Sequence, residues 1–488
     1  MIRIPLSRVL IGTLSALLTV ASLPAAEPAG IQTTQPTQPG GGQVQTVRLL
    51  VQPAAAPMPA MSIQLLPGML DRLPGNAVGT YGIALQQMPA DETEADRERI
   101  EAWLKTAPPA LPRDEVRKVL ARYAQSFRYA VLAGRYERCD WDLPVRQEGF
   151  NLLLPNLQGF RRLGRMLALD ARLALAEGRL DDAISRIRTG LAMSRHISQG
   201  TFLIGALVGI ANATVALEQA RELLTADSSP NLYWALAQLP DPLVSMREAM
   251  EYEQNWLYFS YPQLQGLGDL KLSSEQWNER ARMLVNLPSI TAALGEKPAR
   301  VLDIEAFARG MKMYPQGKQW LIQQGRSAKE VEAMPHGQVI VLSMMGQYEQ
   351  WRDEIFKWFA LPYAQARPGM AKTFDEFERW VSGPGKTNPA AVLLPSLGRS
   401  AFVQARLERE IAALRTVEAV RLYAAAHAGQ PPAELGLIKD VPGPHDPVTG
   451  KPFVYRRQGK GFVLESTEGL KANDQLRWVV EMRELQQK

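Results

Sequence analysis

The chain has 488 residues, of which 46% are hydrophobic and 22% are charged, and its formal net charge is +5. This composition is typical of a globular protein, and so small an excess of positive charge argues against nucleic-acid binding. Cys139 is the only cysteine, so the chain cannot form an internal disulfide. Its stability must therefore come from burial of a hydrophobic core.

Residues 1–26 have the layout of a secretory signal peptide. Arg3 and Arg8 precede the apolar run 9–20, and small residues follow up to Ala26. The run has 12 residues, whereas a membrane-spanning helix needs about 20. We expect an exported protein, periplasmic or secreted, cleaved after Ala25 or Ala26 and carrying a mature charge of about +3.

Residues 27–61 are rich in proline, glutamine, threonine, glycine and alanine. A segment of this composition buries too little apolar surface to fold, so we expect a disordered linker. Its one apolar patch, 47–51, is compatible with a short strand or with an adhesive segment.

Residues 62–395 show apolar side chains every three or four positions, with proline and glycine mostly at breaks. This pattern predicts an α-helical domain, built as one body or as two lobes joined by the loop around 264–274. Asp241 and Pro242 predict the start of a helix that runs to about Phe259. The spacing of Ser327 and Glu330 predicts a capping box.

Within this domain, residues 168–193 predict a pair of closely packed helices. Ala171, Gly178, Ala183 and Gly190 have spacings that resemble a tetratricopeptide helix pair. The resemblance occurs once, whereas a repeat array needs about three copies to bury a continuous core. We therefore expect a helical hairpin and not an array.

Residues 201–217 carry no charge and are the second candidate for a membrane span. Gly205 and Gly209 suit close helix packing in water or in lipid. The segment has 17 residues and contains Asn212, which favours a buried helix of a soluble body. We expect no stable membrane span after signal cleavage.

Residues 396–488 predict a small α+β module. Residues 397–428 read as one long amphipathic helix, in which Leu407, Ile411 and Leu414 belong to an apolar stripe, while Glu408, Arg409, Glu410 and Arg415 fall largely outside it. Runs at 453–456 and 462–465 predict an antiparallel β-hairpin, and 478–480 extends it to a three-stranded meander. The whole chain is therefore predicted to be mainly α, a helical-hairpin body with this module at its C-terminus.

The stretch 417–468, with its Asp446–Tyr455 segment, resembles the C-terminal part of type II secretion pseudopilins. It also resembles the tail of a family of uncharacterised exported bacterial proteins, as does the segment 230–240. The resemblance implies the module's fold. Filament assembly is not implied, because a pseudopilin begins with a hydrophobic helix that leads directly into this module. The calcium-binding loop of the major pseudopilin has no match at 465–469.

Motifs for phosphate, metal and nucleophile chemistry are weak in this sequence. Residues 382–387 resemble a phosphate-binding loop, but Trp380 replaces its first glycine and a helix precedes it, which favours a plain turn. The four histidines, 196, 336, 427 and 445, lack zinc-site spacing; His427, His445 and Asp446 are the only group with any prospect of converging. Cys139 beside Trp141 reads as buried core and not as a nucleophile.

Two further groups leave alternatives open. One predicted helix carries Glu248, Glu251 and Glu253 together with Tyr252 and Trp256. This arrangement suits a hydrolase that uses two carboxylates beside a sugar-binding aromatic residue. It equally suits an acidic helix face exposed to solvent. The aromatic residues between 348 and 359 (Tyr348, Trp351, Phe356, Trp358 and Phe359) line either a core or a ligand groove, and a core is favoured.

The sequence therefore assigns no catalytic, metal-binding or cofactor-binding residue. It favours an exported, non-enzymatic helical scaffold or interaction protein of the cell envelope, with an envelope protein as its possible partner. Two alternatives are an exported hydrolase with a carboxylate-based site and an accessory component of a secretion or pilus-like machine. Fold resemblance alone does not establish any of these functions.

Overall fold

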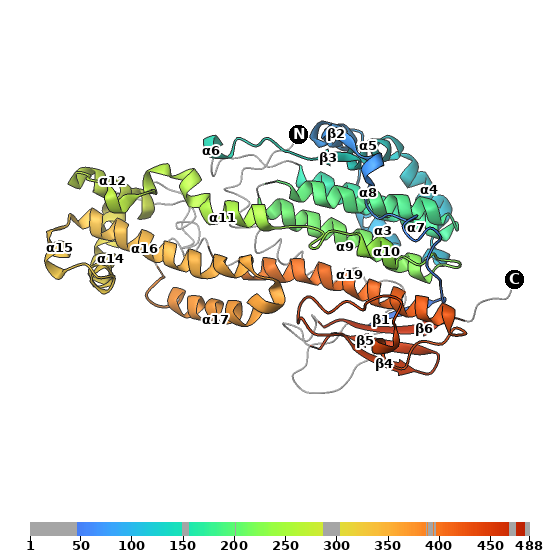
Figure 1. Ribbon diagram of the computed structural model, residues 1–488. Helices are drawn as coiled ribbons and strands as arrows, with labels where there is room; N and C mark the ends of the chain where they lie inside the picture. Colours follow the sequence, from blue (N-terminus) through green and yellow to red (C-terminus); the bar gives the residue numbers. More distant parts are fainter. Residues whose placement is uncertain are drawn as a thin grey trace. The chain divides into compact units, whose positions relative to one another are not determined.

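The computed structural model describes residues 46–148, 156–200, 202–285, 303–386, 397–467 and 475–483, with Asn388 and Leu394. Helices predominate and a small sheet lies in the C-terminal region, so the predicted fold class is confirmed (Figure 1). The predicted signal peptide lies outside the described residues. The chain divides into two compact units, and Asp142–Pro155 and Met250–Ala401 belong to the same one, so the loop at 264–274 lies inside a unit and not between two lobes.

The first unit contains the described residues of Asp142–Pro155 and Met250–Ala401. Its elements are α6 (Val145–Glu148), most of α11 (Arg247–Ser260), η4 (Pro262–Leu264), η5 (Leu267–Asp269), α12 (Ser274–Val285), α14 (Asp303–Gln323), α15 (Ala328–Ala333), α16 (His336–Phe356), η6 (Lys357–Ala360), α17 (Tyr363–Val381) and the start of α19 (Leu397–Ala426). Helices α12, α14 and α16 pack on one another. The predicted capping box begins α15: Ser327 accepts from the Glu330 amide, and the Glu330 carboxylate accepts from the Ser327 amide.

The aromatic stripe of α16 packs within the first unit. Tyr348 and Phe356 are buried. The half-buried Trp351 meets Phe377 and Trp380 of α17 at ring-centroid distances of 5.2 and 5.5 Å. The preference for a core over a ligand groove is therefore confirmed for these residues.

The second unit contains the other described residues. Its elements are β1 (Thr46–Val51), η1 (Met69–Asp71), β2 (Leu73–Asn76), α2 (Val78–Gln86), α3 (Glu94–Lys105), η2 (Pro108–Ala110), α4 (Arg113–Ala121), α5 (Ala124–Gly134), β3 (Tyr136–Arg138), α7 (Leu157–Ala176), α8 (Leu180–Ser198), α9 (Leu203–Thr225), α10 (Tyr233–Ala237), most of α19, η7 (Leu435–Leu437), β4 (Val454–Gln458), β5 (Gly461–Glu465) and β6 (Arg477–Met482). The first residues of α11 also belong here.

Helices α7 and α8 form the predicted hairpin, and α9 packs against both. Small residues make this close packing possible. A Cβ atom on Gly190 would lie 3.1 Å from the Ala216 Cβ, and one on Gly209 would lie 2.6 Å from the Ser194 carbonyl oxygen. The small residues of α8 therefore serve the contact with α9 as well as the hairpin.

Helix α9 is the one helix, among the residues that the structure describes, with the length and composition to cross a membrane. Its most apolar window has a mean hydropathy of 1.4, and 72% of that window is buried. Asn212 is buried as well. The burial agrees with a core helix, and the absence of a span stays a prediction.

The C-terminal sheet has four strands in the order β1-β6-β5-β4. Strands β4, β5 and β6 form the predicted antiparallel meander, in which Leu464 pairs with Tyr455 and with Trp478. Strand β1 joins β6 in parallel, with Leu49 opposite Val480. The patch at 47–51 is therefore a strand, and the module at 396–488 is incomplete without it.

The linker prediction is wrong for the described residues from 46 onward, because buried polar groups fix the chain after β1. The fully buried Arg421 donates to the Gln52 carbonyl at 2.8 Å and to the Ser229 carbonyl at 2.9 Å. Asn231 donates to the carbonyls of Ala54 and Glu418. This set ties the N-terminal strand to the loop after α9 and to α19.

Helix α19 runs unbroken through Arg415, as predicted, and charged residues outside its apolar stripe have partners in other elements. Arg409 is buried and donates to Asp446 at 3.0 Å. Glu410 forms an ion pair with Arg221 of α9 at 2.8 Å. These charges are buried because other elements cover the polar side of the helix and supply partners.

The predicted helix start at Asp241–Pro242 is also wrong, because α11 begins at Arg247. The preceding residues are bound to α19 instead. The Leu243 amide donates to Glu408 at 2.9 Å, and the Met246 amide donates to Gln404 at 3.1 Å. Side chains of α19 thus satisfy amides that a longer α11 would have used.

Candidate functional site

The structure brings no metal site together from the histidines. No group of three or more His, Cys, Asp or Glu side chains is placed to hold a metal within the described parts of the chain. His427 stacks on Tyr423 at 3.7 Å. The buried Asp446 carboxylate accepts from Arg409 and from the Val448 amide. Asp446 therefore serves the core and the turn before β4.

Cys139, Tyr81 and His196 form a buried group in the second unit. Tyr81 and His196 are joined by a hydrogen bond of 3.0 Å at Nδ1, and the His196 ring also bonds the Tyr136 backbone. Burial, followed by the charge of Arg195, lowers the pKa of His196 to about 4. Burial also raises the pKa of the Cys139 thiol, and Asp140 adds to this effect. The group holds α2, β3 and α8 together and offers neither a thiolate nor a free base.

The three acids considered for a hydrolase differ in exposure. Glu248 and Glu251 are exposed, and Glu253 is half-buried. Tyr252 and Trp256 are buried and contact each other at a ring-centroid distance of 5.3 Å. The aromatic side chains therefore belong to the core side of α11, away from the two exposed acids.

The segment that resembles a phosphate-binding loop is a turn at the end of α17. The Gly385 amide donates to the Trp380 carbonyl at 2.8 Å, and Gly385 packs against the Trp380 indole. The depression beside the turn is lined by Asp375, Glu378, Arg379, Ser382 and Gly383, so two carboxylates stand against one cation. The turn reading is confirmed, and Thr387 lies outside the described residues.

A polar cleft of about 380 Å³ lies in the second unit, between the loop before η1, β3, α8 and α10. Its volume is suitable for a small molecule. The residues that line it are Gln64, Leu65, Leu66, Pro67, Gly68, Met69, Arg72, Gly134, Tyr136, Glu137, Ala192, Arg195, His196, Gln199, Ala235, Gln238, Leu239 and Pro240.

Helix α8 contributes the 192–199 side of the cleft, where side chains three and four positions apart share one face. Ala192 meets Gly134 at the end of α5, because a Cβ atom on Gly134 would lie 3.4 Å from the Ala192 Cβ. Small residues at these two positions therefore let α5 and α8 approach closely beside the cleft.

Arg195 is the distinctive group of the cleft. Its side chain is half-buried and has no hydrogen-bond or ion-pair partner in the described part of the chain. Burial lowers its pKa, and the nearby positive charge of Arg72 lowers it further. Arg72 is exposed and donates from Nε to the Pro67 carbonyl at 3.2 Å. The cleft thus holds two like charges near each other, with Glu137 as the one acidic residue in its lining.

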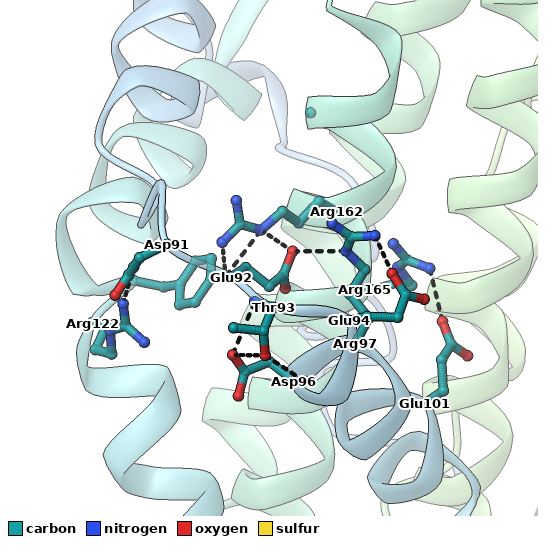
Figure 2. Close-up of polar contacts among 12 residues, drawn as sticks. Asp91, Glu92, Thr93, Glu94, Asp96, Arg97, Glu101, Arg122, Arg162 and Arg165 are labelled. Carbon is teal, nitrogen blue, oxygen red and sulfur yellow. Dashed lines mark hydrogen bonds and ion pairs between the residues drawn. The ribbon is translucent and has the colours of Figure 1, made fainter.

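Several arginines elsewhere in the same unit have acidic partners, although the half-buried Arg161 has none within the described residues. Figure 2 shows Arg162 paired with Glu92 at 2.9 Å, and Arg165 paired with Glu101 at 2.7 Å. Arg122 is paired with Asp91 in the same view. The half-buried Arg162 thus has an acid in contact, which Arg195 lacks.

Buried arginines of the same unit are paired as well. Arg172 of α7 reaches Glu222 at 3.3 Å, Gln219 at 3.2 Å and the Thr106 carbonyl at 2.5 Å. Burial raises the pKa of Glu218, near this group, to about 7. No cleft residue contributes to this network, which we interpret as structural.

The chain matches no protein-family model, no curated protein and no solved structure. The described residues define a mainly helical chain with a small mixed sheet and a polar cleft, lined by two arginines, in the second unit. The sequence reasoning missed Arg72, Arg195 and Gln199. A weak signal existed, because Arg195 stands beside His196 in a segment that is otherwise poor in charge.

Proposed function

We propose that the protein is an exported, non-enzymatic interaction protein of the cell envelope, and that the cleft around Arg195 is its binding site. Two neighbouring side chains of the cleft, His196 and Arg195, differ in their partners. His196 is bonded to two other elements, whereas Arg195 has no partner within the described residues. The cleft thus presents the donors of Arg195 and Arg72 for recognition, while the histidine in its lining is already engaged by hydrogen bonds.

The experiment is site-specific photocrosslinking in the native host. A photoreactive residue replaces Met69 or Gln238 in the cleft, and a control replaces Leu437, which is exposed on η7. We expect one defined adduct from both cleft positions and none from position 437, with the bound species recovered chemically unchanged. Adducts of equal yield at all three positions, or a bound species converted to product, would contradict the proposal.

A second candidate is an accessory role in a secretion or pilus-like machine. It is favoured by the long helix α19 with the β4-β5-β6 meander, which is the arrangement that the pseudopilin resemblance implies. The parallel strand β1 departs from an isolated module. Deleting the gene in a host with type II secretion should impair release of a reporter enzyme if this role is correct. Normal release would argue against it.

A further inference from the structure

We infer that the cleft binds a small oxyanion, a carboxylate or a phosphate group, between Arg195 and Arg72. This inference rests on the proposed binding function and names the chemistry of the ligand. A carboxylate and a phosphate share one feature, which is a negatively charged group with several oxygen acceptors. Guanidinium groups recognise this feature with paired hydrogen bonds.

First, Arg195 is partly removed from water without an acceptor among the described residues to replace it. A cation in a partly buried position is stabilised by a carboxylate or by several hydrogen bonds, and Arg172 and Arg421 of the same unit have both. Arg195 has neither among the described residues, and it faces a cleft with room for a ligand. An oxyanion in the cleft would supply the missing acceptors.

The second step concerns the pair of charges. The positive charge of Arg72 is close enough to disfavour protonation of Arg195. An anion between them would convert this repulsion into two attractions. The Nε atom of Arg72 is held by the Pro67 carbonyl, so the terminal nitrogens of Arg72 remain available for the ligand.

The third step concerns the neutral groups. Gln199 lines the cleft, and its Oε1 accepts from the Cys139 amide at 2.7 Å. This bond leaves its side-chain NH₂ as a donor. Glu137 is exposed at the cleft, and its carboxylate would repel a second anionic group of the ligand on that side. The geometry thus favours a ligand with one concentrated anionic group.

The test is calorimetry on the purified protein at low salt with three probes: succinate, inorganic phosphate and the neutral analogue succinamide. We expect saturable binding of succinate or of phosphate, whichever supplies the natural group, and none of succinamide. Arg195→Gln should weaken binding at least about 10-fold, because charge-assisted hydrogen bonds are lost. Arg128→Gln, a change of an exposed arginine on α5, should leave the affinity unchanged.

Arg72→Gln is a second variant, and it should fold normally because Arg72 is exposed. It should also weaken binding, and the affinity should fall with added salt. Binding of succinamide equal to succinate, no saturable binding of either anion, or unchanged affinity in Arg72→Gln and a folded Arg195→Gln would overturn the inference. If cleft positions crosslink to a partner but no anion binds, the anion inference fails and the proposed binding function stands. If a bound anion is converted to product, the non-enzymatic function fails and the anion site stands.

Discussion

Replacing Arg421 with methionine tests whether buried charges hold the N-terminal strand in place. Arg421 and Glu418 are both fully buried, and one Arg421 nitrogen contacts both Glu418 oxygens at 2.9 Å. The substitution leaves the Glu418 carboxylate buried without its cation, which costs about 3 to 5 kcal/mol. It also leaves the carbonyls of Gln52 and Ser229 without these donors, so we expect a loss near the upper end of that range.

The assay is urea unfolding at pH 7 followed by circular dichroism, combined with trypsin cleavage after Arg48 in β1. Arg421→Met should lower the free energy of unfolding by about 4 to 5 kcal/mol. It should also speed trypsin cleavage after Arg48, whose side chain is exposed but whose backbone is held by pairing with β6. The double variant Glu418→Met/Arg421→Met should recover much of the loss, because no charge is then left unpaired. Arg128→Met, on the exposed side of α5, should change stability by less than about 0.5 kcal/mol. A loss below about 1 kcal/mol for Arg421→Met, or a double variant as unstable as the single one, would refute the reasoning.

Four further predictions follow from the fold. Burial raises the pKa of Glu408 in the folded protein to about 7; the hydrogen bond from the Leu243 amide opposes this shift, and the charge of Asp241 adds to it. The contribution of Glu408 to stability is therefore full below pH 4.5 and is lost as the pH rises through 7. In urea titrations, Glu408→Gln should therefore exceed the parent by on the order of 3 kcal/mol at pH 8 and equal it at pH 4, and an equal gain at both would contradict this. Gly209→Ala should cost about 1 to 3 kcal/mol in thermal unfolding, because its Cβ meets the Ser194 carbonyl, whereas Gly82→Ala, with open space around it, should stabilise α2 by about 1 kcal/mol. Intact-mass measurement of exported protein should give an N-terminus at Ala26 or Glu27, and a retained Met1 would oppose cleavage. The protein without residues 1–26 should stay in solution without detergent, and a need for detergent would favour a span at α9.

Helical periodicity predicted most of the body because it depends on neighbours in sequence. The α7–α8 hairpin, the capping box at Ser327 and the unbroken helix through Arg415 all follow from spacings of three or four residues. The strand β1 depends on a partner more than 400 positions away in the chain. A short apolar patch in a proline-rich segment carries no information about that partner, so its pairing could not be predicted.

The same limit applies to the charged residues of α19. Charged residues on an amphipathic helix are solvated in most proteins, and the stripe of Leu407, Ile411 and Leu414 is indeed buried. Arg409 and Glu410 depart from the rule because Asp446 and Arg221 are brought to them by later and earlier parts of the chain. Periodicity identifies the helix and one buried face, but the partners on its other face depend on the tertiary fold.

The cleft could not be predicted for a related reason. Arg172 and Arg195 are both arginines in the α7–α8 hairpin, and local sequence gives no reason to treat them differently. The fold places Glu222 and the Thr106 carbonyl at Arg172, whereas it places open volume and a second cation at Arg195. Since desolvation of a guanidinium is unfavourable in either place, the first arginine is explained by the protein itself. For the second we propose a bound molecule, and for that reason Arg195, and not the acids of α11, is the residue on which functional experiments should begin.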